Sequence, residues 1–175
     1  MSQLDVNALV FVDETGVNIA MARRYARAPK GKRAHASAPV NKGKNVTILG
    51  ALSLHGIQAA MTIEGSTDTQ VFLTFVQTVL VPTLRPGQIV IMDNLSSHKV
   101  DGIQEAILAA GAKLEYLPSY SPDFSPREKC WSKFKEFLRS KAARTYELLD
   151  NTITEALEII TPQDARGWFS HCGYV

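Results

Sequence analysis

The sequence has only two cysteines and no run of apolar residues long enough to cross a bilayer. Cys130 and Cys172 cannot form a disulfide framework, and no second pair of ligands stands near Cys172 to complete a zinc site. The N-terminal segment MSQLDVNALVFVDE is mixed and acidic, which argues against a signal peptide. These features argue against secreted, disulfide-rich and membrane-spanning classes, and we expect a soluble protein of the cytoplasm.

Acidic residues are absent from Thr15 to Ile63, although the chain carries 17 of them and a net charge of only +2. Eight of its 19 Lys and Arg residues fall between positions 23 and 44, within that span. One interpretation is a solvated basic loop. The lack of compensating acids instead favours a surface that binds nucleic acid. The candidate DNA-binding residues are Arg23, Arg24, Arg27, Lys30, Lys32, Arg33, Lys42 and Lys44.

The length of 175 residues and the 45% hydrophobic content fit one globular domain over residues 1–175. Near the start we expect a hairpin of residues 6–13 and 17–28, followed by a flexible loop to Lys44. The remaining pattern predicts strands at 46–54, 57–63, 89–93 and 113–117, helices at 72–80, 100–110, 125–143 and 146–160, and a short tail after Pro162. This order predicts an α/β fold with a mixed central sheet flanked by helices.

Two of the predicted strands end in aspartate. Ile89 to Met92 is a continuous apolar run, typical of a strand covered on both faces, and Asp93 follows it. Ala8 to Val12 has the same character and leads into Asp13. Ligands of open α/β sheets gather at the carboxyl ends of strands, so both aspartates are candidate ligand-binding residues. Glu14 faces the opposite way along its strand and is not counted among them.

A third carboxylate, Glu128, begins the helix expected after a loop rich in proline and serine. Ser125 is a good N-cap and Pro126 suits the first helical position, so Glu128 fits a capping box. Trp131 belongs to the apolar stripe of this helix, and Glu128 lies about 60° from it, at the edge of the buried interface. Glu128 is therefore either a helix cap or a metal ligand, and its spacing allows both.

Three segments together resemble a known family. FVDETG, IMDNLSSHK and LPSYSPDFSPREKCWSKFK are similar to the catalytic blocks of DDE transposases of the mariner superfamily, in its bacterial insertion-sequence branch. The 34 residues between Asp93 and Glu128 (128 − 93 − 1) match the spacing of that superfamily. The resemblance implies a ribonuclease H-like fold. It also implies that Asp13, Asp93 and Glu128 are catalytic and hold two Mg²⁺ or Mn²⁺ ions.

The implied reaction is hydrolysis of a phosphodiester at a transposon end, followed by transfer of the freed 3′-OH to target DNA. The resemblance implies a homodimer at work. The helix-turn-helix region that relatives carry before this domain is absent here, so we expect a fragment or a separately encoded recognition subunit. A catalytically inactive DNA-binding remnant or decoy subunit is the alternative. A ribonuclease or junction resolvase of the same fold would share the chemistry, but the block spacing disfavours it.

Several neighbouring residues carry a second interpretation. Asn94 and His98 are candidates for a supporting role beside Asp93, although a cap of the following turn is the favoured interpretation of His98. Tyr120 is a candidate for stacking on a base, and Trp131 for core packing. In the third block, Ser125 and Arg127 replace the Asn and aliphatic residue common in relatives, and Arg127 is a further candidate for contacting DNA.

Overall fold

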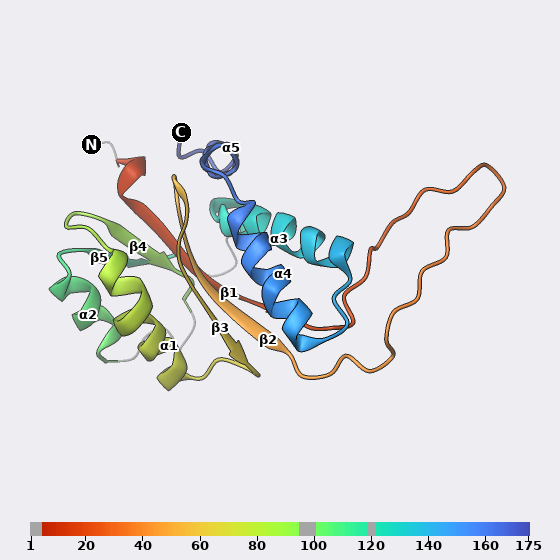
Figure 1. Ribbon diagram of the computed structural model, residues 1–175. Helices are drawn as coiled ribbons and strands as arrows, with labels where there is room; N and C mark the ends of the chain where they lie inside the picture. Colours follow the sequence, from red (N-terminus) through yellow and green to blue (C-terminus); the bar gives the residue numbers. More distant parts are fainter. Residues whose placement is uncertain (1–4, 95–100, 119–121) are drawn as a thin grey trace.

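The computed structural model describes residues 5–94, 101–118 and 122–175, and its centre is a five-stranded sheet (Figure 1). The strands follow the order β3-β2-β1-β4-β5 across the sheet. Their bounds are Leu9–Val17 for β1, Val46–Ser53 for β2, Gly56–Glu64 for β3, Ile89–Met92 for β4 and Lys113–Tyr116 for β5.

The sheet is mixed, as the sequence predicts. β1 pairs antiparallel with β2, and β2 pairs antiparallel with β3. On its other edge β1 pairs parallel with β4, which in turn pairs parallel with β5. β1 is therefore the central strand, and it joins the antiparallel half of the sheet to the parallel half.

Helices cover both faces of the sheet, which explains why the central strands are apolar without alternation. Leu9 and Phe11 of β1 belong to one core, and Val10 and Val12 belong to the other. The first core is closed by α3 (Arg127–Lys141), α4 (Tyr146–Glu158) and α5 (Pro162–His171), and the second by α1 (Thr69–Phe75), the π-helical turn Val76–Leu80 and α2 (Ile103–Ala109).

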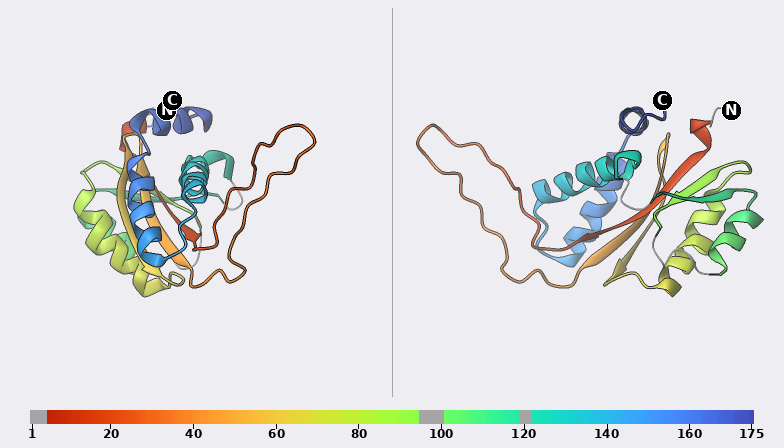
Figure 2. Two further views of the ribbon diagram at one scale, coloured as in Figure 1. Left: turned by 45° about the vertical axis from the view of Figure 1, so that its right-hand side comes forward. Right: turned by 180° about the vertical axis from the view of Figure 1, so that it is seen from behind.

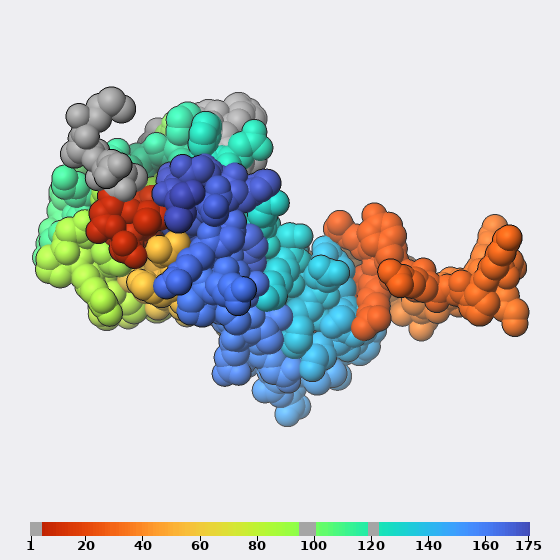
Figure 3. Space-filling view, turned by 90° about the horizontal axis from the view of Figure 1, so that it is seen from above, coloured from red at the N-terminus to blue at the C-terminus, as the bar shows by residue number. Residues whose placement is uncertain are grey.

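The predicted hairpin of residues 6–13 and 17–28 is wrong. β1 continues through Gly16 to Val17, and its antiparallel partner is β2, with Val17 opposite Val46. Residues 18–45 contain no strand; we call them the basic loop. This loop projects from the body in every view (Figures 2 and 3). Its residues lack an apolar alternation, and the sheet edge that they would occupy is taken by β2.

The C-terminal segment is also more ordered than the predicted short tail. Pro162 opens α5, and Thr161 and Asp164 form a reciprocal capping box around it. Phe169 is fully buried against Phe11, with the two rings edge to face at 5.4 Å. No helix of the described residues is long and apolar enough to cross a membrane.

Gly50 of β2 provides a test of how tightly α3 is packed on the sheet. A Cβ atom at Gly50 would lie 2.7 Å from the Trp131 ring, so Gly50→Ala forces the ring to move. We expect a loss of about 1–3 kcal/mol in the free energy of unfolding, measured by urea denaturation. Gly16→Ala is the matched control, since that strand glycine has no atom within 4 Å of an added Cβ. Equal stability of the two variants would contradict this packing.

Candidate metal centre

Asp13 and Asp93 lie close together on neighbouring parallel strands, with Asp13 in the middle of β1 and Asp93 directly after the end of β4. The register pairs Leu9 with Ile89 and Phe11 with Ile91, and two further residues along each chain lead to Asp13 and Asp93. Neighbouring strands are about 4.8 Å apart. Because side chains alternate, both aspartates share the face of Leu9 and Phe11, which is the face covered by α3. The charge of Asp93 contributes to raising the pKa of Asp13, in agreement with this proximity.

The Asp13 side chain is only 18% exposed and is held by two residues of α3. The Trp131 indole Nε1 donates a hydrogen bond to Asp13 Oδ2 at 3.0 Å. Arg127 Nη1 lies 3.6 Å from Asp13 Oδ1. Burial raises the pKa of Asp13 above its usual range, and the Arg127 guanidinium opposes that rise. The Asp13 carboxylate is thus held in one orientation, but its ionised form is unfavourable in free energy when no cation is bound.

Arg127 is buried, with 6% of its surface exposed, and it connects α3 to β1. Its Nη1 donates to the Val12 carbonyl oxygen, and its Nε donates to Ser125 Oγ at 2.7 Å. The structure corrects two predictions here. Arg127 does not face outward toward DNA, and Ser125 is not the helix N-cap, because Pro126 takes that position and Ser125 accepts the Arg127 bond instead.

Glu128 lies in the first turn of α3, one residue beyond Arg127, and is exposed. With Pro126 at the N-cap, the Ser125–Glu128 capping box is absent, so the cap interpretation of Glu128 is wrong. The charges of Glu128 and Asp13 both act on the pKa of Lys135 and oppose its fall. Among the described residues, however, no three Asp, Glu, His or Cys side chains already form a metal-binding group.

The donor chemistry fits a hard divalent cation. Asp13 and Asp93 supply adjacent carboxylate oxygens on one face of the sheet, and repulsion between them contributes to the raised pKa of Asp13. A cation would remove that penalty, and oxygen ligands suit Mg²⁺ or Mn²⁺ better than zinc. We refer to the three side chains Asp13, Asp93 and Glu128 together as the carboxylate group. Asp13 and Asp93 lie close together, and Glu128 lies in the first turn of α3.

One basic residue close to the carboxylate group was not predicted. Lys135 follows Glu128 by seven residues, so at 100° per residue it lies within about 20° of the same helix face. Burial lowers the pKa of Lys135, Arg139 and Arg24 lower it further, and Glu128 and Asp13 oppose the change. Helical spacing counted from Glu128 is the sequence signal that would have identified it.

The other predicted residues divide into three sets. Trp131 is buried in the core as predicted, and Cys130 is buried beside it. Asn94 is exposed next to Asp93, whereas His98 and Tyr120 lie outside the described residues. All eight basic candidates between positions 23 and 44 are exposed, and Lys44 forms an ion pair with Glu64 at 3.2 Å.

Comparison with known proteins agrees with the resemblance seen in the sequence. The family model described as DDE superfamily endonuclease matches residues 8–150. Among curated proteins, the search found no match. Solved structures of the Mos1 mariner transposase share the fold, which confirms the predicted ribonuclease H-like architecture.

Three of these structures illustrate the likeness. The Mos1 paired-end complex with the left transposon end has a TM-score of 0.78 at 15% identity, and the Mos1 mariner paired-end complex with Mn has 0.77 at 18%. These matches cover 95% and 94% of this chain, but only 52% of the Mos1 chain in each case. The Mos1 catalytic domain alone has a TM-score of 0.66 at 12% identity, covering 95% of this chain and 77% of that one.

Replacing Arg127 tests whether it holds the helix on the strand. Arg127→Gln leaves the Val12 carbonyl and the buried Asp13 without their cation, and we expect the free energy of unfolding to fall by about 3 kcal/mol. Arg166→Gln, an exposed change on α5, should stay within about 0.5 kcal/mol of the wild type. Urea denaturation measures both, and equal values would contradict the assigned role.

The same variant changes the pH dependence. The pKa of Asp13 is already above its usual value, so its contribution to stability is full below the unfolded pKa of 3.8 and is lost as pH rises through the folded pKa. Removal of Arg127 raises that folded pKa further, so the loss should extend to higher pH. Urea denaturation repeated from pH 3 to pH 8 measures this shift, and Asp13→Asn should abolish it.

Proposed function

The chain belongs to the DDE superfamily of endonucleases, and on that premise we propose that it is the catalytic domain of a transposase. The proposed activity is metal-dependent hydrolysis of a DNA phosphodiester at a transposon end, followed by transfer of the 3′-OH strand into target DNA. The observation that supports this proposal is the parallel register of β1 and β4, which leads to Asp13 and Asp93 next to the first turn of α3, where Glu128 lies.

In this mechanism the carboxylate group, Asp13, Asp93 and Glu128, would hold two Mg²⁺ or Mn²⁺ ions through carboxylate oxygens. Bound divalent ions supply activation of the attacking hydroxyl and stabilisation of the leaving oxygen. Trp131 and Arg127 keep Asp13 oriented, since each contacts a different oxygen of its carboxylate. Lys135 would attract a phosphate oxygen by charge, because it lies on the same face of α3 as Glu128.

The reaction then proceeds in two steps that use one site. Water attacks the phosphorus, the bond to the 3′ oxygen breaks, and the strand end keeps a hydroxyl group. That hydroxyl later attacks a target phosphodiester in the same manner. The protein needs to form no covalent bond with the DNA, because phosphoryl transfer depends mainly on positioning and charge stabilisation.

DNA is the proposed partner, contacted by the exposed basic residues between positions 23 and 44. Mos1 is described in a paired-end complex with the left transposon end. By analogy we propose that two copies of this chain act together, that residues 1–175 serve as a single catalytic domain, and that a separately encoded helix-turn-helix subunit recognises the ends. Asn94, beside Asp93, is proposed to orient the phosphate.

One observation favours the alternative function, a DNA-binding subunit without catalysis. Glu128 is exposed and lies outside any metal-binding group of the described residues. The two proposals differ in metal dependence, because a non-catalytic subunit would bind DNA in a salt-sensitive way without cutting it.

Nicking of a supercoiled plasmid in Mg²⁺ or Mn²⁺ tests the catalytic proposal. We expect the wild type to nick, and Asp13→Asn, Asp93→Asn and Glu128→Gln each to lower the rate by at least 100-fold, because each removes a charged metal ligand. Glu14→Gln is the matched control, since it neutralises the carboxylate next to Asp13 on the opposite face of β1. It should nick at the wild-type rate.

Thermal unfolding gives a second measurement that needs no cleavage. Mn²⁺ at 100 times its Kd should stabilise the wild type by about 2.7 kcal/mol, and Asp93→Asn should lose that gain. Stabilisation without nicking would support the non-catalytic subunit. Nicking that survives Asp93→Asn would overturn the assignment of the site.

A further inference from the structure

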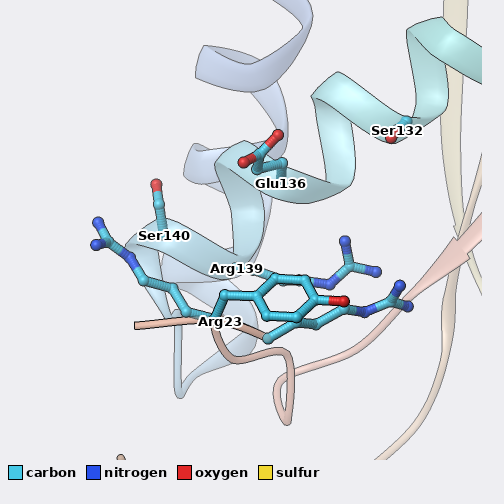
Figure 4. A pocket seen from close by; sticks show the side chains of 7 residues that line it. Arg23, Ser132, Glu136, Arg139 and Ser140 are labelled. Carbon is cyan, nitrogen blue, oxygen red and sulfur yellow. The ribbon is translucent and has the colours of Figure 1, made fainter. Parts of the chain in front are cut away.

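A pocket of about 500 Å³ lies outside the carboxylate group, between α3 and the start of the basic loop. Its labelled side chains come from both elements. Arg23 reaches in from the loop, while Glu136, Arg139 and Ser140 come from the last turns of α3 (Figure 4). We call it the arginine pocket.

The charge of the arginine pocket favours an anionic ligand. Three of its lining residues are arginines, Arg23, Arg24 and Arg139, and among the described lining residues one, Glu136, is acidic. Burial lowers the pKa of Arg139, and the nearby charge of Arg24 lowers it further. In the free protein these guanidinium groups repel one another. A bound phosphate would offset that repulsion, and arginine binds phosphate through paired N–H donors.

The pocket also contains an aromatic ring that has no packing role in the core. Tyr25 lines the pocket and is 89% exposed. Exposed aromatic rings beside arginines are the usual platform for unpaired nucleotides, because every base can stack on them and the arginines hold the phosphates. The combination therefore suits a nucleotide rather than an isolated anion.

The loop that carries Arg23, Arg24 and Tyr25 is tied to the body at both ends. Arg144 Nη1 donates to the carbonyl oxygens of Ile19 and Met21, both at 2.9 Å, just before these residues. At the other end the Tyr146 hydroxyl accepts a hydrogen bond from the Lys44 amide at 2.5 Å. Both partners lie at the corner between α3 and α4, so the root of the loop is fixed beside α3, where Figure 3 shows it leaving the body.

The arginine pocket lies in line with the carboxylate group along α3. Arg139 follows Glu128 by eleven residues, which is about 20° of rotation and about 16.5 Å of rise. Lys135 stands between them on the same face. These two positive charges continue along the helix face from the carboxylate group to the pocket, so a strand bound at the carboxylate group can extend along α3 to Arg139.

We propose that the arginine pocket binds one nucleotide of an unpaired DNA strand, with its phosphate between Arg24 and Arg139 and its base stacked on Tyr25. The identity of the strand rests on the proposed function, and the pocket would hold the substrate strand about 16.5 Å along α3 from Glu128. An opened strand end, rather than intact duplex, is then the form of DNA that the site selects.

Fluorescence anisotropy in EDTA, where no strand can be cut, tests this site on the full chain. The probes are a labelled oligothymidylate of twelve residues and an abasic strand with the same number of phosphates. Tyr25→Ala should weaken binding of the oligothymidylate about 5- to 150-fold and leave the abasic strand unchanged, whereas Tyr25→Phe should bind both like the wild type. Arg139→Gln should weaken both probes and lower the salt slope by about 0.7.

Arg166→Gln is the matched control, because it removes the same charge from an exposed position on α5 and should change neither probe. The proposal is overturned if Tyr25→Ala binds oligothymidylate as the wild type does, or if both Tyr25→Ala and Arg139→Gln weaken a twelve-pair duplex more than the single strand. The proposed function fails separately, through absence of nicking by the wild type in metal, and that result would leave the strand-binding measurement valid.

Discussion

The buried guanidinium of Arg127 is the contact on which the arrangement of the site depends. It joins the first turn of α3 to the middle of β1 through the Val12 carbonyl, and it approaches Asp13 and Ser125 at the same time. Without this contact α3 would still pack on the sheet by its apolar stripe. Its rotation and height relative to Asp13 would then be set by hydrophobic packing alone, which is not directional. Arg127 thus fixes the rotation and height of α3 relative to Asp13.

The sequence allowed much of this to be predicted, for identifiable reasons. Apolar runs that end in Asp13 and Asp93 indicate buried strands, and the 34-residue spacing to Glu128 accompanies the resemblance to a family. The pairing of the two aspartates follows only when β1 and β4 are known to be parallel neighbours, which the periodicity of single strands does not reveal. The predicted hairpin failed for the same reason, since strand pairing is a property of distant segments.

Other features were missed because they depend on side-chain contacts. Ser125 and Arg127 were each treated as a separate departure from the family pattern, one as a cap and the other as a DNA contact. In the structure they bind each other, at 2.7 Å between Arg127 Nε and Ser125 Oγ. Two departures that look independent along the chain form one hydrogen-bonded unit that keeps α3 on β1. Arginine is usually exposed, so its burial at position 127 could not be expected from the sequence. The burial is explained by the groups that Arg127 contacts, which only the structure shows.

Both ends of the basic loop are held by hydrogen bonds, so the outer part of the loop is structurally independent of the sheet. Because Arg144 and Tyr146 hold the residues at its two ends, the register of β1 against β2 does not depend on what lies between. Closing a longer flexible segment costs little, about 0.6 kcal/mol for each doubling of its length. Insertions and deletions between Arg27 and Lys42 should therefore be tolerated by the fold, which leaves the reach of this segment free to diverge between related chains while the sheet stays constant.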